Sequence, residues 1–230
     1  MTIDSGLAQS ESVQNFLKAV YTLQRDMERV PTSALAEHLG ISPPSVTDMA
    51  RRLEVVGLVD YRKHRGVVLT PEGEAIALKI IRRHRLIEAY LVEELGYAPY
   101  EVHEEAEQLE HAVSERFVQE IARKLGHPDF DPHGDPIPAH DGSMLSRDLS
   151  ALSELPVNTK GRIARIATSD ADLLRHILER GFKLDSAVEV LTRDPFEGPI
   201  TATVDGKERM LGHRVASVVL IDVSSIPSES

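Results

Sequence analysis

Two histidines and two glutamates recur at helical spacing in one short acidic segment of the chain. They are His103, Glu107, Glu110 and His111, at positions i, i+4, i+7 and i+8. On a helix, all four side chains would project from one side. Imidazole and carboxylate groups are common ligands of divalent metal ions. The segment therefore predicts a metal-binding helix face, with a solvated acidic surface as the alternative interpretation.

A second pair with the same chemistry favours the metal interpretation. His84 and Glu88 stand at i and i+4 on the expected preceding helix. The chain has no cysteine, which excludes disulfides and thiolate metal ligands. Any bound metal must therefore be held by nitrogen and oxygen atoms. Such a ligand set suits Mn(II), and Fe(II) is the alternative.

The net charge of the chain, −11 at pH 7, at first argues against nucleic-acid binding, which depends on lysine and arginine. The charge is unevenly distributed, however. Residues 1–70 carry eight basic and eight acidic side chains and sum to zero, so the acidic excess lies in residues 71–230. A basic cluster in the neutral part comprises Arg51, Arg52, Arg62, Lys63 and Arg65. This cluster keeps DNA binding open for the N-terminal part.

The overall composition predicts a globular protein. Hydrophobic residues make up 41% of the 230 residues, and no run of eighteen uncharged apolar residues occurs. The N-terminus does not combine a basic patch with an apolar stretch, as a secretory signal would. We therefore expect a cytoplasmic protein without membrane segments, long enough for one large or two modest domains.

The elements expected in the N-terminal part form a winged helix-turn-helix. The expected helices are residues 10–27, 33–38 and 43–57, and the expected strands are 58–61 and 67–69. Thr32 and Ser42 are candidate N-caps, Gly40 is a helix stop, and Pro43 suits a first helical turn. The two later helices have helix-turn-helix spacing, and the strands form a hairpin with a basic tip.

The remainder of the chain changes from helical to β-rich. Helices are expected at residues 71–95, 99–114 and 115–125, and the proline-rich segment 126–150 reads as a linker. This segment contains several histidines and aspartates, but its spacing gives no fixed helix face, so we expect no metal site there. Short β-segments follow, with one helix at 170–179, and they suggest a small barrel.

Taken together, these residues resemble the diphtheria toxin repressor family of metal-dependent bacterial repressors, over nearly the whole chain. The resemblance is carried by segments 42–47, 61–70, 83–88, 102–111 and 134–138, and the C-terminal part looks like the SH3-like domain of the family. It implies a mainly α protein with small β parts. The implied domains are a winged helix-turn-helix DNA-binding domain (1–72), a helical metal-binding and dimerisation domain (73–142), a linker (143–154) and an SH3-like, FeoA-like β-barrel (155–230).

The resemblance also implies two metal sites per chain. The primary site of the family maps onto Asn15, Glu107, Glu110 and His111, and the ancillary site maps onto His84, Glu88 and His103. Asp170 and Asp172 lie where the barrel domain of some relatives donates ligands to the ancillary site.

Two of these positions depart from the pattern of the iron-responsive members. Glu107 stands where those members have cysteine, as in the manganese transport regulators. Asn15 stands where the iron branch has methionine and the manganese branch has aspartate, and Lys18 replaces a second acid of the manganese branch. Because an amide supplies no negative charge, we expect Asn15 to weaken the primary site.

The function implied is a manganese-responsive, DNA-binding repressor of metal homeostasis genes, and an iron(II)-responsive repressor is the alternative. The implied partners are a second copy of the chain and a palindromic double-stranded DNA operator, because a two-fold dimer places two recognition helices in successive major grooves. We expect base contacts from Ser42, Pro44, Ser45, Thr47 and Asp48, and phosphate contacts from Arg51, Arg52, Arg62, Lys63 and Arg65. A two-metal hydrolase could use the same ligands, but the chain offers no obvious nucleophile.

Overall fold

The computed structural model describes residues 10–224, which form two compact units. The first unit contains residues up to His84 together with Pro138–Ser143, and the second contains Arg85–Ile137 and the chain from Met144 onward. The division falls within one long helix, α5 (Pro71–Leu95). None of the described helices is both long enough and apolar enough to cross a membrane.

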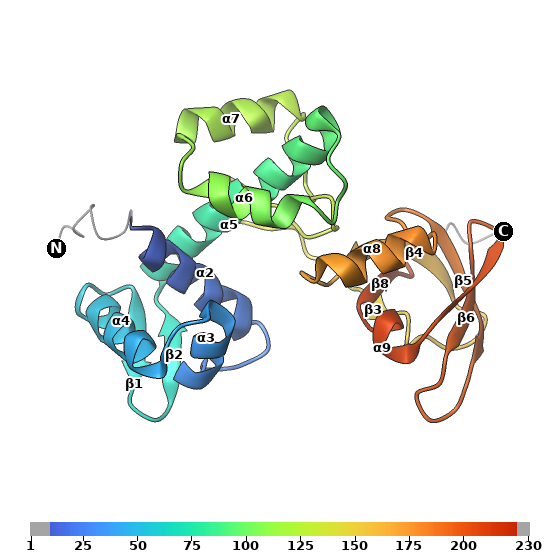
Figure 1. Ribbon diagram of the computed structural model, residues 1–230, viewed down its shortest axis with the longest axis horizontal. Coiled ribbons are helices and arrows are strands. Elements are labelled where there is room, and N and C mark those ends of the chain that lie inside the picture. The colour runs from blue at the N-terminus through green and yellow to red at the C-terminus, as the bar shows by residue number, and fades with distance from the viewer. Residues whose placement is uncertain (1–9, 225–230) are drawn as a thin grey trace. The chain divides into compact units, whose positions relative to one another are not determined.

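The first unit has the predicted order of a winged helix-turn-helix (Figure 1). It contains α2 (Glu11–Gln24), α3 (Thr32–Leu39), α4 (Pro43–Val55), β1 (Val59–Arg62), β2 (Gly66–Leu69) and the start of α5. The two strands pair antiparallel from Val59↔Leu69 to Arg62↔Gly66. Its core is built by fully buried side chains on all of these helices, among them Phe16, Leu17, Leu35 and Leu53.

Local signals explain where these helices begin and end. The Ser42 hydroxyl accepts a hydrogen bond from the Ser45 N–H, which caps α4 as predicted. Gly40 ends α3 in the left-handed conformation, with φ of 63°. The prediction for Thr32 was wrong. Pro31 is the N-cap residue of α3 and Thr32 is already helical, because the fixed, extended proline backbone turns the chain into the helix.

The helical part of the second unit contains the end of α5, α6 (Val102–Glu110) and α7 (Glu115–Lys124). Leu86, Leu91, Val102 and Ile121 are among the buried side chains that join the three helices. The expected helix over residues 99–114 is shorter than predicted. It ends at Glu110, and Ser114 caps α7 by accepting a hydrogen bond from the Phe117 N–H.

The C-terminal part of the second unit is a six-stranded antiparallel sheet. Its strands are β3 (Ser150–Ala151), β4 (Lys160–Ile166), β5 (Ala187–Arg193), β6 (Ile200–Val204), β7 (Lys207–Leu211) and β8 (Val219–Asp222), in the order β3-β8-β4-β5-β6-β7. Helix α8 (Ala171–Glu179) packs Leu174 and Ile177 into the same core, and α9 (His213–Ala216) is a single turn. The described sheet is open, whereas the sequence suggested a closed barrel. Edge strand β3 is only two residues long, and the other edge, β7, pairs with β6 alone.

The segment interpreted as the start of a linker contains a compact turn. The Ile137 N–H donates to the Asp129 carbonyl (2.8 Å), and the Asp131 N–H donates to the Asp135 carbonyl (2.9 Å). The Asp131 carboxylate closes the turn by accepting from the N–H groups of His133 (2.8 Å) and Asp135 (2.9 Å). We call residues 131–135 the ligand turn. These hydrogen bonds define the path of its backbone.

Candidate metal centre

The predicted donors on and next to helix α6 differ in how far their side chains are exposed to solvent. Glu110 is completely buried, and its Oε1 atom lies 3.3 Å from Nε2 of His111, which follows the helix as its C-cap residue. Glu107, one turn before His111, and His103, two turns before it, are partly exposed, with Glu107 Oε1 and His103 Nε2 4.0 Å apart. Val102 and Ala106 bury the adjacent face in the core. The four donors therefore lie at the margin of the core.

Glu88 on α5 joins this set, as its spacing predicted. Its carboxylate is buried, and Oε1 lies 3.4 Å from Nδ1 of His103 across the contact between α5 and α6. A buried carboxylate is unfavourable unless it is hydrogen-bonded or faces positive charge. Glu88 and His103 thus form one half of a site that could hold a cation.

The ligand turn supplies two further donors, in a segment where the sequence led us to expect no metal site. Nδ1 of His133 lies 3.8 Å from Glu88 Oε2 and 3.9 Å from Asp131 Oδ1. One donor atom from each of the three residues lies within 4.8 Å of the others, and all three side chains are buried. We call Glu88, Asp131 and His133 the trio. Two carboxylates and an imidazole at this separation fit a divalent metal ion.

The protonation of His133 is set by its second ring nitrogen. Nε2 lies 2.8 Å from the Pro99 carbonyl oxygen, which can only accept, so Nε2 carries the proton and donates. In the neutral ring, Nδ1 then presents its lone pair towards the two carboxylates. Metal-binding histidines are commonly held by this kind of hydrogen bond. The contact therefore orients His133 as a ligand.

The electrostatics of the trio also fit a cation. Burial, together with the negative charges of Asp135 and Glu88, raises the pKa of the Asp131 carboxyl to about 6, against the opposing effect of His133 and Arg85. Without additional positive charge nearby, the folded protein thus disfavours the ionised form of Asp131. A divalent cation would favour the ionised form.

A turn signal in the sequence could have identified these two donors. Asp131 is followed by Pro132, and Gly134 follows His133, a pattern typical of tight turns closed by an aspartate side chain. The search by helical periodicity did not detect it, because the ligand turn has no helical repeat.

The remaining predicted ligands of the helical region lie in the first unit. Asn15 is partly buried on α2, and His84 is buried on α5, with its Nδ1 atom 3.2 Å from Lys18 Nζ. Because the predicted primary site combines Asn15 with donors of the second unit, its assembly stays a prediction.

The two aspartates of α8 have structural contacts instead. Asp170 is the N-cap residue, and its Oδ1 atom accepts from the N–H groups of Asp172 and Leu173, both at 3.0 Å. Asp172 is exposed and pairs with Arg175 at 3.1 Å. Neither residue belongs to the trio. Their role as ligands of the ancillary site stays a prediction.

The predicted DNA-contacting residues lie on the surface of the first unit. Ser42, Pro44, Ser45 and Asp48 are exposed along the beginning of α4, and Thr47 is partly buried, with its hydroxyl donating to the Pro43 carbonyl. The five cations of the basic cluster are all exposed, on α4 and on the β1–β2 hairpin. This is the distribution expected of a recognition helix beside a basic wing.

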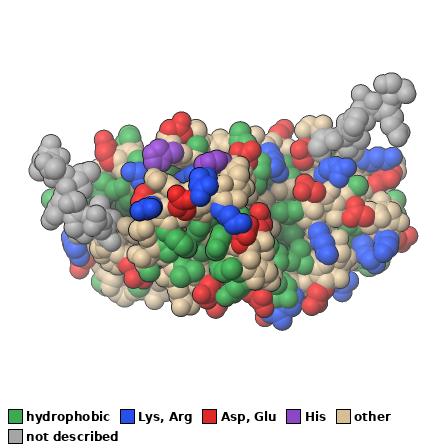
Figure 2. Space-filling view, turned by 90° about the horizontal axis from the view of Figure 1, so that it is seen from above, with side chains coloured by type: hydrophobic (Ala, Val, Ile, Leu, Met, Phe, Trp, Pro, Cys, Tyr) green, Lys and Arg blue, Asp and Glu red, His purple; other side chains and the backbone are tan. Residues whose placement is uncertain are grey.

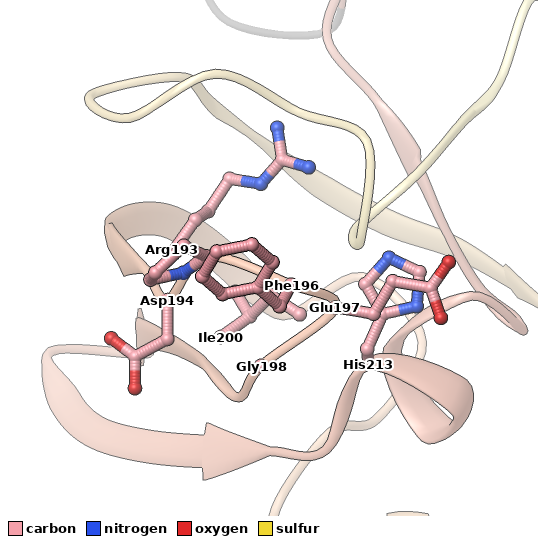
Figure 3. Close-up of a pocket in the computed structure, with 8 residues that line it drawn as sticks. Arg193, Asp194, Phe196, Glu197, Gly198, Ile200 and His213 are labelled. Carbon is pink, nitrogen blue, oxygen red and sulfur yellow. The ribbon is translucent and has the colours of Figure 1, made fainter.

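A hollow of about 330 Å³ lies at the β5–β6 loop (Figure 3). Arg193, Asp194, Glu197 and His213 line it, and the Phe196 side chain beside them is fully exposed. None of the predicted metal or DNA residues lines this hollow. The hollow is therefore separate from the candidate metal centre, which lies at the α5–α6 contact and the ligand turn.

Three family models match successive parts of the chain. Residues 9–67 match the N-terminal DNA-binding domain of iron-dependent repressors, and residues 70–139 match their metal-binding and dimerisation domain. Residues 151–223 match the FeoA domain. Together the three matches cover most of the chain.

Individual relatives match along nearly their whole length. A solved structure of a manganese-dependent transcriptional repressor in complex with manganese is 40% identical, with a TM-score of 0.85, covering 92% of this chain and 99% of that one. The structure of the manganese regulator SloR is 32% identical, with a TM-score of 0.72 and coverage of 92% and 98%. The iron-dependent repressor IdeR of Mycobacterium leprae is 28% identical, covering 92% of this chain and 97% of the relative.

Proposed function

The chain belongs to the diphtheria toxin repressor family of metal-dependent transcriptional repressors, and from this premise we propose that Mn(II) is the ion that activates it. The family consists of DNA-binding repressors and not of enzymes, which sets aside the two-metal hydrolase. Relatives include both manganese-dependent and iron-dependent repressors. Fe(II) is therefore the competing ion in the experiment below.

The observation that carries the proposal is the donor chemistry of the trio. Glu88, Asp131 and His133 offer oxygen and imidazole nitrogen in a buried setting, and the chain contains no thiolate. Hard oxygen ligands suit Mn(II), whereas sulfur ligands favour softer ions. Glu107, where iron-responsive members have cysteine, supports the same preference.

We assign two metal sites to each chain. The primary site consists of Asn15, Glu107, Glu110 and His111, and the second consists of the trio, with His84 and His103 as further ligands of this region. The second assignment extends the predicted set of His84, Glu88 and His103 by two residues of the ligand turn. It omits Asp170 and Asp172, because their carboxylates serve α8.

The bound ion supplies positive charge between carboxylates that otherwise repel one another. An ion at the proposed primary site would be held by Asn15 of α2 together with Glu110 and its neighbours on α6. An ion at the second site would be held by Glu88 of α5 and the ligand turn. An ion that binds the DNA-competent arrangement more tightly than the alternative shifts the population towards the DNA-competent arrangement. Repression therefore follows the concentration of free Mn(II).

DNA binding is assigned to the exposed beginning of α4 and to the basic wing. In this proposal, Ser42 and Thr47 meet base edges and Lys63 meets phosphates. Two copies bind a palindromic operator, since a homodimer has two recognition helices related by symmetry. Exposed apolar side chains on and near the helices of the second unit, including Leu95, Tyr97 and Phe117, support self-association. Apolar side chains also gather in the middle of the face shown in Figure 2, with charged side chains around them.

A metal titration coupled to DNA binding tests this function. Metal-free protein is first loaded with Mn(II) and used to select its binding site from random duplex DNA. Binding to that duplex is then measured against free Mn(II), Fe(II) and Zn(II), with a shuffled duplex as the DNA control. Among the three ions, we expect Mn(II) to promote specific binding at the lowest free concentration, within the range that is reached in cells. Stronger promotion by Fe(II) under anaerobic conditions would instead identify an iron-responsive repressor.

Two histidine variants connect the response to the trio. His133→Ala removes a proposed ligand from the ligand turn, whereas His140→Ala removes an exposed histidine from the same stretch of chain. We expect only His133→Ala to lower the metal stoichiometry of the chain. An unchanged stoichiometry would remove the trio from the proposed metal sites.

A further inference from the structure

The C-terminal sheet reaches the trio through a carboxylate that is not itself a proposed ligand. Oδ1 of Asp135 accepts a hydrogen bond from Arg85 Nη2 at 3.3 Å and lies 2.7 Å from Nη2 of Arg165, on β4. Arg85 Nε in turn lies 3.6 Å from Oδ2 of Asp131. A series of ion pairs thus extends from the proposed ligand Asp131, through Arg85 and Asp135, to the sheet.

These ion pairs are shielded from solvent. The side chains of Arg85, Asp135 and Arg165 are 15%, 16% and 19% exposed, and that of Asp131 is 3% exposed. Exposed ion pairs contribute little to the stability of a fold. Loss of one partner from a buried pair, however, leaves a charge without compensation. The position of Asp135 therefore depends on Arg165.

The backbone of the ligand turn also contacts the end of β4. The Ile166 N–H donates to the His133 carbonyl at 2.9 Å. Gly134 has a φ of 86°, and a Cβ atom added there would lie 2.1 Å from the Ala164 carbonyl oxygen. Glycine is required at this position because the turn and the strand approach so closely. Two of the three trio residues thus lie on a turn that is held against the sheet.

We propose that Arg165 is a positioning residue for the trio, through which the C-terminal sheet sets the metal affinity of that site without donating a ligand. Asp131 and His133 lie on a turn, which lacks the rigidity of a helix, so an external contact must hold them in place. Residues that orient metal ligands in this way contribute substantially to affinity. The inference rests on the proposed function, because it assumes that the trio binds the ion.

Mn(II) binding to a matched pair of variants tests the role of Arg165. Arg165→Met removes the guanidinium group and keeps much of the apolar stem. Lys160→Met is the control on the same strand, where Lys160 forms an exposed pair with Glu189 at 3.8 Å. Both are measured in a His111→Ala background, in which the proposed primary site lacks a ligand. We expect Arg165→Met to weaken Mn(II) binding by about tenfold or more, and Lys160→Met to leave it unchanged.

Two further variants separate positioning from general damage to the fold. Asp135→Asn should also weaken binding, and the double variant should be no weaker than Asp135→Asn alone, since the contact with Arg165 is already disrupted in that variant. Arg165→Lys should recover part of the affinity, because it restores a positive charge on β4. Additive losses in the double variant would contradict the proposal.

Hydrogen exchange at a single amide gives a readout that does not depend on affinity. Because coupling between two sites is reciprocal, Mn(II) should slow exchange of the Ile166 amide, which donates to His133. We expect this protection in the parent protein and in Lys160→Met, and a smaller protection in Arg165→Met. Protection that is equal in all three proteins would overturn the proposal.

The same measurements distinguish failure of the inference from failure of the proposed function. If His133→Ala lowers the stoichiometry while Arg165→Met and Asp135→Asn bind Mn(II) like the parent, the trio is a metal site and Arg165 does not position it. If His133→Ala binds Mn(II) normally, the trio is not a metal site, and both that assignment and the role of Arg165 are wrong.

Discussion

The Lys18 ammonium group lies 3.2 Å from Nδ1 of His84, so a side chain of α2 contacts a buried, proposed metal ligand of α5. An ammonium group has only donors, so the ring nitrogen accepts and carries no proton. Lys18 thus places a tethered positive charge where the manganese-regulator pattern has an acid. This charge should oppose a divalent cation that approaches His84.

Replacing Lys18 with methionine should therefore tighten Mn(II) binding. The change keeps the length of the side chain and removes its charge, and we expect an increase in affinity of about threefold to tenfold, equivalent to about 1 kcal/mol. Lys63→Met, which removes a charge from the exposed wing, is the control. Isothermal titration of both variants with Mn(II) measures the effect, and weaker binding by Lys18→Met would mean that Lys18 supports the site.

Asn15→Asp should also increase the affinity for Mn(II), because it adds an anionic ligand to the proposed primary site. The increase should be larger in the Lys18→Met background, where no ammonium group on the next turn of α2 can pair with the new carboxylate. Titrations of Asn15→Asp, Lys18→Met and the double variant measure this difference. If the aspartate has no effect in either background, residue 15 is not a ligand.

The raised pKa of Asp131 predicts how the stability of the metal-free protein depends on pH. The carboxyl has a pKa of about 6 in the folded protein, against 3.8 in the unfolded chain. Between these values the folded state binds a proton that the unfolded state has lost, so stability decreases as the pH rises from about 4 to about 6. At neutral pH, the folded metal-free protein therefore lacks all of the stability that protonated Asp131 contributes at low pH.

Asp131→Asn should consequently stabilise the metal-free protein at about pH 7.5, by a free energy of unfolding on the order of 2 kcal/mol. The amide oxygen can still accept the hydrogen bonds of the ligand turn. The advantage should shrink near pH 4, and Mn(II) should raise the Tm of the variant less than that of the parent. Thermal melts with EDTA and with Mn(II) measure both effects, with the exposed neighbour Asp129→Asn as the control. Equal melting of the two variants without metal would contradict the prediction.

Lys63→Ala should weaken binding to specific and shuffled DNA by similar factors, because a phosphate contact carries no sequence information. The slope of log affinity against log salt should become shallower by about one unit. Lys207→Ala, an exposed lysine on β7, should leave the slope unchanged. Binding measured over a series of salt concentrations tests this, and an unchanged slope for Lys63→Ala would remove it from the DNA surface.

Local signals made most of the fold predictable from the sequence. Ser42 before two prolines marks the start of α4, and Pro71 followed by acidic residues marks the start of α5, because these side chains satisfy or tolerate the free N–H groups of a first turn. The spacing of Glu88 and His103 likewise anticipated that both would lie at the candidate metal centre.

The part of the site that was missed depends on contacts between distant segments. His133 is oriented by the Pro99 carbonyl, and its turn is held by Arg165. No periodicity in the sequence reports such contacts, and proline and glycine made the segment resemble a linker. The open sheet was missed for a related reason, since strand pairing at an edge is not encoded within a single strand.

Glu107 provides the sharpest test of metal selectivity. Glu107→Cys introduces a soft thiolate ligand at the proposed primary site, so the response to Fe(II), Co(II) and Zn(II) should increase relative to Mn(II). Glu104→Cys places the same thiol on an exposed position of α6 and serves as the control. DNA binding by each variant is titrated with all four ions under anaerobic, reducing conditions. An unchanged order of metals in Glu107→Cys would show that selectivity does not arise from residue 107, whereas the same change in Glu104→Cys would indicate binding by the thiol alone.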